Sequence, residues 1–252
     1  MTPIAYLPFV IVFVVVPVAI LTILLGVRRR FQPFQVSGTV LLAGVALVYT
    51  FPWDGQLIRL GIWDYGSTLV GRLGVVPYEE LLFIVAQTVL TGLWTTLIDT
   101  PDGSGSVSWR PRVVGVLAGG AIGVAGLALL SIPAGTYLGA ILVWAAPVLA
   151  LQWGFGWPVL LRRRRTVAIA LAVPTVYLWV VDRLAIEIGL WTFSATQTTG
   201  FAILGLPIEE ALFFLVTNAF LVQGLVLLGW VVERDAISTV TDVLDTTVER
   251  AE

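Results

Sequence analysis

The sequence predicts an all-α integral membrane protein with about seven transmembrane helices, arranged as two parallel three-helix repeats joined by a linker helix. The first observation is the composition: the 252 residues are 58% hydrophobic and 12% charged, with a mean hydropathy of +0.96. Soluble domains average about 45–50% apolar and about 25% charged residues. So little charge cannot cover a water-facing surface of this size, which excludes a soluble globular protein and a disordered chain.

Seven apolar runs are the second observation. A helix that crosses a bilayer needs about 20 apolar residues, because each residue rises about 1.5 Å. The first run is followed by Arg28–Arg30 and has no basic residue before it. A secretory signal has the opposite charge order, so we expect a retained helix. The runs cover residues 4–27, 36–51, 77–98, 113–130, 136–161, 166–181 and 207–232.

Arginine placement supports seven helices and predicts their orientation. Cytoplasmic loops collect basic residues, and seven helices bring all three arginine clusters to one side of the membrane. The protein is then expected to be a multi-pass protein of the cell membrane, with the N-terminus outside and the C-terminus in the cytoplasm. The acidic tail is expected to form a short cytoplasmic helix or to be disordered. The clusters are Arg28–Arg30, Arg110 with Arg112, and Arg162–Arg165.

An internal duplication is the third observation. Asp54 and Trp63 recur at one common interval as Asp182 and Trp191, and the segment Pro77–Phe83 recurs at nearly the same interval as Pro207–Phe213. Helices one to three therefore match helices five to seven, and helix four restores the orientation, which makes the copies parallel repeats. The predicted units are a first repeat (1–98), a cytoplasmic loop with the linker helix (99–135), a second repeat (136–232) and the acidic tail (233–252).

The residue types that are absent restrict the chemistry. The chain has no cysteine and no histidine, and all 14 basic residues are arginine. Zinc, haem and iron–sulfur ligation, a Ser-His nucleophile and a lysine Schiff base are therefore excluded, and no metal site is expected. General acid–base catalysis falls to Asp and Glu, with help from Tyr. The net charge of -2 gives no indication of nucleic-acid binding.

The repeated motif Pro-x-Glu-Glu-x-x-Phe is the main indication of chemistry. It supplies Glu79 and Glu80 in the first copy and Glu209 and Glu210 in the second. Proline followed by glutamate also fits two ordinary helix starts. Ionisable groups near a bilayer are costly, however, and tend to mark function. We expect one neutral and one ionised carboxyl group in each pair, or one proton shared across the pairs, which places an acid beside a base.

Aromatic and polar residues follow each motif along its helix. Phe83, Phe213 and Phe214 lie one helical turn after motif glutamates. Their rings either stabilise a carbocation or pack against other helices and lipid. Gln87 and Asn218 lie further along and either form hydrogen bonds between helices or hydrate a pocket. The sequence therefore favours a cavity at the start of these two helices.

Four more candidates belong to the longer connections, residues 52–76 and 182–206, which are rich in Trp, Gly and Thr. Both connections are expected on the outer side, where Trp settles at the interface. The tryptophans are either interface anchors or walls of the pocket. The aspartates either form an interfacial cap or an ion pair with arginine, or they orient the reacting groups. The candidates are Trp63, Trp191, Asp54 and Asp182.

The two Pro-x-Glu-Glu motifs in a duplicated apolar chain resemble the membrane carotenoid cyclases of the heterodimeric type, here fused into one chain. These are lycopene cyclases, and the resemblance covers residues 36–98 and 166–232. It implies that the linear ψ-ends of lycopene become β-rings, with Glu79, Glu80, Glu209 and Glu210 as the acid–base set. No flavin or other cofactor is expected, because no glycine-rich dinucleotide fingerprint is present.

The resemblance also implies the partners. The substrate is a lipophilic polyene delivered through the lipid bilayer, and contact with other membrane enzymes of the carotenoid pathway is compatible with this location. No nucleic-acid partner is expected.

Two other interpretations stay open at this point. A proton-coupled transporter would also use parallel repeats and matched carboxylates. A non-catalytic membrane partner subunit would share the same helices. An intramembrane protease would need histidine for its metal, and a prenyl-diphosphate transferase would need an Asp-rich magnesium motif, so both are excluded.

Overall fold

The computed structural model describes residues 5–66, 68–98, 103 and 105–249, with side chains as far as Asp235. It contains seven helices that are long and apolar enough to cross a membrane, so the predicted all-α membrane fold is confirmed. The helical elements are α1 (Tyr6–Val10), η1 (Ile11–Val15), α2 (Val16–Val27), α3 (Pro33–Arg59), α4 (Tyr78–Ile98), α5 (Trp109–Leu130), η2 (Pro133–Gly135), α6 (Thr136–Arg162), α7 (Arg164–Glu187) and α8 (Ile208–Glu249).

Two of the predicted boundaries are wrong, and the error moves two candidate residues. The second span continues past Phe51 through Pro52 to Arg59, and the sixth continues past Val181 to Glu187. A proline is tolerated in a membrane helix where its surroundings satisfy the freed carbonyl group. Asp54 and Asp182 therefore lie on the last turns of α3 and α7 and do not begin the connections.

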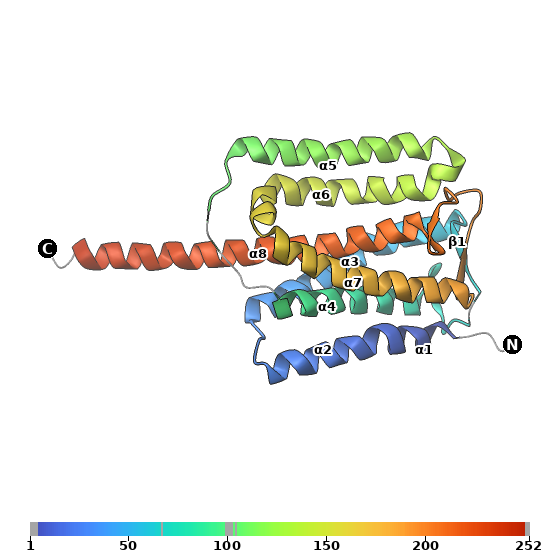
Figure 1. Cartoon of the computed structure of the whole chain (residues 1–252), viewed down its shortest axis with the longest axis horizontal. Coiled ribbons are helices and arrows are strands. Elements are labelled where there is room, and N and C mark those ends of the chain that lie inside the picture. The colour runs from blue at the N-terminus through green and yellow to red at the C-terminus, as the bar shows by residue number, and fades with distance from the viewer. Residues whose placement is uncertain (1–4, 67, 99–102, 104, 250–252) are drawn as a thin grey trace.

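The helices alternate in direction through a single bundle (Figure 1). Helices α5 and α6 lie side by side along one edge, and α1 with α2 lies along the opposite edge. The end of α2, the start of α5 and the turn between α6 and α7 share one end of the bundle, so the three arginine clusters lie together as predicted. Which side of the cell membrane this end faces stays a prediction.

The acidic tail continues the last helix. Helix α8 runs without interruption to Glu249 and extends beyond the other helices (Figure 1). Of the two expectations for residues 233–252, the helix is therefore the correct one as far as Glu249. Residues 99–102 and 104 of the predicted cytoplasmic loop lie outside the described residues.

Close packing of α5 against α6 depends on glycine. A Cβ atom added to Gly119 would lie 2.4 Å from Cα of Ala150, and one added to Gly126 would lie 2.8 Å from N of Val143. Gly120 has nothing within 4 Å of the corresponding point. Small residues let membrane helices approach closely and gain dispersion contacts. The linker helix α5 is thus fixed to α6 along its glycine face, and the rest of its surface faces lipid.

Short strands cover the end of the bundle opposite the three arginine clusters (Figure 1). The antiparallel pair β1–β4 joins a strand from each half, with Trp63 opposite Phe193 and Tyr65 opposite Trp191. Each half adds a small hairpin immediately before the helix that carries its motif. The strands are β1 (Trp63–Tyr65), β2 (Arg72–Leu73), β3 (Val76–Pro77), β4 (Trp191–Phe193), β5 (Ala202–Ile203) and β6 (Leu206–Pro207).

The two halves therefore contain the same series of elements: a strand, a hairpin and a motif helix. This matches the duplication seen in the sequence. The parallel relationship between the copies and the four predicted units remain predictions.

Candidate active site

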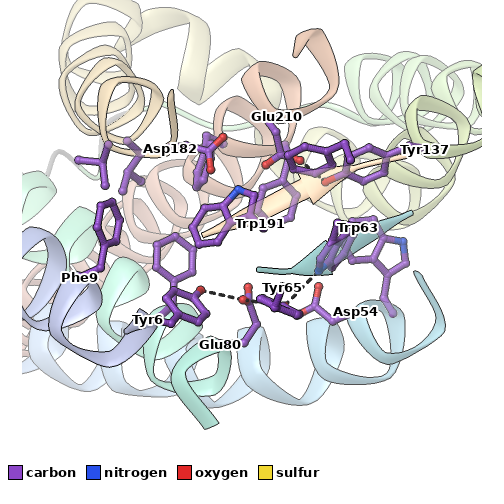
Figure 2. A pocket seen from close by; sticks show the side chains of 17 residues that line it. Tyr6, Phe9, Asp54, Trp63, Tyr65, Glu80, Tyr137, Asp182, Trp191 and Glu210 are labelled. Atoms are coloured by element: carbon purple, nitrogen blue, oxygen red, sulfur yellow. Dashed lines mark hydrogen bonds between the residues drawn. The ribbon is translucent and has the colours of Figure 1, made fainter. Parts of the chain in front are cut away.

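A cavity lies between the helices beneath the β1–β4 pair and is lined by both halves of the chain. It brings together one carboxyl group from each of α3, α4, α7 and α8. Figure 2 shows Glu80 and Asp54 on one side of this cavity and Glu210 and Asp182 on the other. The remaining walls are aromatic or aliphatic: Tyr6, Phe9, Trp53, Trp63, Tyr65, Phe83, Tyr137, Leu178, Val181, Trp191, Phe193, Phe213 and Phe214.

Glu80 is surrounded by phenolic hydrogen-bond donors. Its Oε2 accepts a 2.8 Å hydrogen bond from the hydroxyl group of Tyr6 and a 3.1 Å hydrogen bond from that of Tyr65. Trp63 Nε1 in turn donates to the Tyr65 oxygen at 3.0 Å. Burial, and after it the negative charge of Glu80, raise the pKa of Tyr65 well above its ordinary value. Tyr65 therefore stays a neutral donor to Glu80 at physiological pH.

Glu210 has one phenolic donor where Glu80 has two. The hydroxyl group of Tyr137 donates a 2.5 Å hydrogen bond to its Oε1. The position in β4 that matches Tyr65, two residues after the repeated tryptophan, is Phe193 and has no hydroxyl group. The two carboxyl groups thus occupy similar places in different electrostatic surroundings.

The first glutamate of each motif faces away from the cavity. Glu79 Oε1 accepts a 2.6 Å hydrogen bond from the backbone amide of Val70. Glu209 Oε1 accepts from the amide of Thr199 at 2.6 Å and from its hydroxyl group at 2.8 Å. Both side chains are at most 1% exposed. Consecutive residues of a helix do not share a face, so each motif divides into one residue that fixes a loop and one that faces the cavity.

Asp54 and Asp182 lie in the cavity wall itself. They are 2% and 3% exposed, and Oδ2 of each has no hydrogen-bond partner among the described residues. The arginine pairing that the sequence left open does not form for Asp182, because Arg183 pairs with Glu187 at 3.2 Å. Both aspartates therefore contact the cavity directly.

Five of the seven predicted pocket residues line the cavity. Phe83, Phe213, Phe214, Trp63 and Trp191 do so. The remaining two, Gln87 and Asn218, do not line it and form hydrogen bonds between helices, and Gln87 also lines a second cavity deeper in the bundle. Gln87 Nε2 donates to the Thr217 hydroxyl group at 3.0 Å, and Asn218 contacts Thr91 and Thr175.

Sequence reasoning missed the three tyrosines that contact the glutamates. Tyr6 and Tyr137 each belong to the first turn of the first helix of a half. The interval between them is close to the one that separates Trp63 from Trp191. The internal duplication could therefore have identified both tyrosines. Tyr65 has no counterpart in the second copy, so no signal of that kind identified it.

The site places the two carboxyl groups of Glu80 and Glu210 in a cavity whose other walls are mostly aromatic. Two carboxyl groups, each with a phenol as neighbour, can deliver one proton and accept another. Among the described residues, no group of three Asp or Glu side chains could hold a metal ion.

Comparison with known proteins identifies the family. The family model described as lycopene cyclase matches residues 134–228. A lycopene beta-cyclase of Halobacterium salinarum is 47% identical over 232 residues, which cover 91% of this chain and 98% of that protein. A bifunctional lycopene cyclase/phytoene synthase of Phaeosphaeria nodorum is 36% identical over 84% of this chain and 39% of its own length. No solved structure matches the chain significantly. The resemblance found in the sequence is confirmed: the chain belongs to the lycopene cyclase family.

Proposed function

We propose that the chain is a lycopene β-cyclase, which converts the linear ψ-ends of lycopene into β-rings, towards β-carotene. The similarity to the Halobacterium salinarum lycopene beta-cyclase supports this substrate. The observation that carries the mechanism is that Glu80 and Glu210, from different halves, line one cavity with aromatic walls. The reaction is an isomerisation of the intramolecular lyase type and needs no oxidant, reductant or cofactor.

The proposed reaction begins and ends with a proton transfer. A carboxylic acid protonates the terminal alkene and leaves a tertiary carbocation. An internal double bond then attacks this cation and closes a six-membered ring, which moves the positive charge into the ring. A carboxylate removes a proton from the neighbouring carbon and restores a double bond. One proton enters and one leaves, so the carotenoid keeps its composition.

We assign the acid to Glu210 and the base to Glu80. Hydrogen bonds donated to a carboxylate stabilise its ionised form. Glu80 accepts two such bonds, from Tyr6 and Tyr65, whereas Glu210 accepts one from Tyr137. The negative charge is therefore better stabilised on Glu80, which leaves Glu210 as the group that carries the proton.

The aromatic walls fit a cationic intermediate. An aromatic face within about 6 Å of a cation stabilises it by about 0.5–2 kcal/mol. Phe83, Phe213 and Phe214 belong to the wall near the glutamates. The same rings exclude water, which would otherwise capture the cation and give an alcohol.

The site must be reset after each reaction. Glu80 then holds the proton that Glu210 has lost. Asp54 and Asp182 line the same cavity, each with an oxygen that has no partner among the described residues. We assign to them the return of the proton from Glu80 to Glu210. Glu79 and Glu209 position the loops and take no part in proton transfer.

Expression in lycopene-accumulating cells, followed by pigment chromatography, tests the proposal. We expect cyclic carotenes with the unmodified chain and a loss of about 100-fold or more with Glu80→Gln or Glu210→Gln, in the range for removal of an acid or base. Glu187→Gln is the matched control, because this exposed glutamate pairs with Arg183 at the surface. Linear pigment alone with the unmodified chain, or undiminished ring formation in both variants, would contradict the proposal.

The proposed location is the cell membrane, with the N-terminus outside and the C-terminus in the cytoplasm. The substrate reaches the site from the lipid bilayer. Contact with other membrane enzymes of the carotenoid pathway is consistent with this location.

A further inference from the structure

A second cavity lies deeper in the bundle, between α3, α4, α6 and α8. Most of its lining is apolar, including Leu42, Ala46, Ile84, Val148 and Leu221. It shares the wall formed by Phe213 with the cavity that contains Glu80 and Glu210. The two spaces are therefore neighbours on either side of this one ring.

The depth of the second cavity follows from the residues of α8 that line it. Glu210 lines the first cavity, and Leu221, eleven residues further along α8, lines the second. At about 1.5 Å per residue, this distance along the helix is about 17 Å. The apolar core of a bilayer is about 30 Å thick. The two cavities in series thus extend from the carboxyl groups to about the middle of the membrane.

Most polar groups around the second cavity bond to the protein, although Trp144 Nε1 and Gln152 Oε1 have no partner among the described residues. Tyr49 donates to the Trp144 carbonyl group at 2.7 Å, and Gln152 Nε2 donates to the Phe220 carbonyl group at 2.8 Å. Gln87 donates to Thr217 at 3.0 Å. The surface that remains for a ligand consists mostly of hydrocarbon and aromatic rings, which suits a hydrocarbon ligand.

The second cavity also reaches the outer surface of the bundle. Val45 of α3 belongs to its lining and is 53% exposed. In a membrane protein this surface faces lipid. A hydrophobic molecule in the bilayer therefore has a route to the cavity beside Val45 that does not pass through water.

We propose that the second cavity binds the linear polyene chain of the substrate while one end group lies between Glu80 and Glu210. This inference rests on the proposed function and deepens it. The polyene enters from the bilayer beside Val45, and its end passes Phe213 into the first cavity. Only one end of the molecule lies between the carboxyl groups at a time. Formation of a second ring therefore requires the molecule to leave and to bind again in the reverse orientation.

The test fills the second cavity from two opposite walls, with Ala46→Trp on α3 and Val148→Trp on α6. The matched controls are Val48→Trp and Leu151→Trp on the same helices, whose side chains are 76% and 72% exposed and line neither cavity. Each purified protein is given lycopene or a short acyclic polyene that consists of the same end group alone and is too short to reach the second cavity. Ring formation and the amount of bound lycopene are both measured.

We expect Ala46→Trp and Val148→Trp to lower cyclisation of lycopene about tenfold or more, because a filled cavity forces the ligand out. Cyclisation of the short polyene by the filled variants, and of both polyenes by the controls, should stay within about twofold of the unmodified protein. Equal rates with lycopene in all variants would overturn the inference, as would equal losses with both polyenes in proteins that remain folded. If the unmodified protein forms no ring, the proposed function fails, and the binding of lycopene still tests the cavity.

Discussion

Tyr65 and Phe193 occupy matching positions at the ends of β1 and β4, yet only Tyr65 carries a hydroxyl group that reaches a carboxyl group. Both rings line the same cavity. This single difference gives Glu80 a second donor that Glu210 lacks. The two halves of a duplicated chain have thereby acquired different surroundings for their glutamates.

Replacement of Tyr65 by phenylalanine tests the role of this difference. The change removes the 3.1 Å hydrogen bond to Glu80 and leaves the ring in place. A hydrogen bond to a charged group contributes about 1.5–3 kcal/mol, so its loss weakens the preference of the resting proton for Glu210 over Glu80 by about tenfold or more. We expect cyclisation to fall by that factor, measured as ring formation in membranes. Tyr78→Phe, at a half-exposed position outside the cavity, should have no effect.

Glu209 is expected to act on stability rather than on the reaction. Glu209→Ala leaves the amide and hydroxyl groups of Thr199 without their acceptor. An unsatisfied buried donor costs about 1–3 kcal/mol of unfolding free energy, which thermal unfolding in detergent would detect. Glu209→Gln keeps an acceptor oxygen and should retain most of the stability and the cyclisation. Abolished ring formation in a well-folded Glu209→Gln protein would assign this residue to the chemistry.

Adjacent glycines of α5 offer a matched test of helix packing. Gly119→Val places atoms against Ala150, where a Cβ atom would already lie 2.4 Å from Cα, whereas Gly120→Val meets nothing within 4 Å. Overpacking costs about 1–3 kcal/mol. We expect Gly119→Val to lower the midpoint of thermal unfolding and Gly120→Val to leave it nearly unchanged. Similar midpoints for both variants would show that α5 does not depend on this contact.

The stability of the protein should fall in alkaline solution. The pKa of Tyr65 is raised in the folded state. The contribution of Tyr65 to the stability of the fold is therefore fully present below the pKa of an unfolded tyrosine, about 10. Above that pH the unfolded chain releases the proton more readily than the folded chain, and stability decreases. With no lysine, cysteine or histidine, tyrosines dominate side-chain titration in this range. Thermal unfolding across it should show a smaller loss for Tyr65→Phe, and an identical loss would contradict the assignment.

The number of helices was predictable because a bilayer demands long apolar runs. The ends of α3 and α7 were not, since both helices continue through polar residues such as Asp54 and Asp182 that are buried by other segments. Hydropathy records composition along the chain and contains no information on burial by distant residues. The same reason explains why the aspartates were expected at the start of the loops.

The site was predictable in part. The doubled motif identified Glu80 and Glu210, but the sequence presents Glu79 and Glu209 as their equals. The rotation of a helix separates each pair, and the position of the surrounding loops decides which member faces the cavity. The hydrogen bond from Tyr6 to Glu80 joins residues that are 74 positions apart in the sequence. Such a contact depends on how the first helix packs, which no local pattern reveals.

The β1–β4 pair has a consequence for how the gene can change. Each half supplies one strand of the pair, and Trp63, Tyr65, Trp191 and Phe193 from these strands form part of the wall. A half expressed by itself would present an unpaired strand edge and an open chamber exposed to solvent. Each copy therefore evolves under the constraint of fitting the strand and the cavity wall that the other copy supplies.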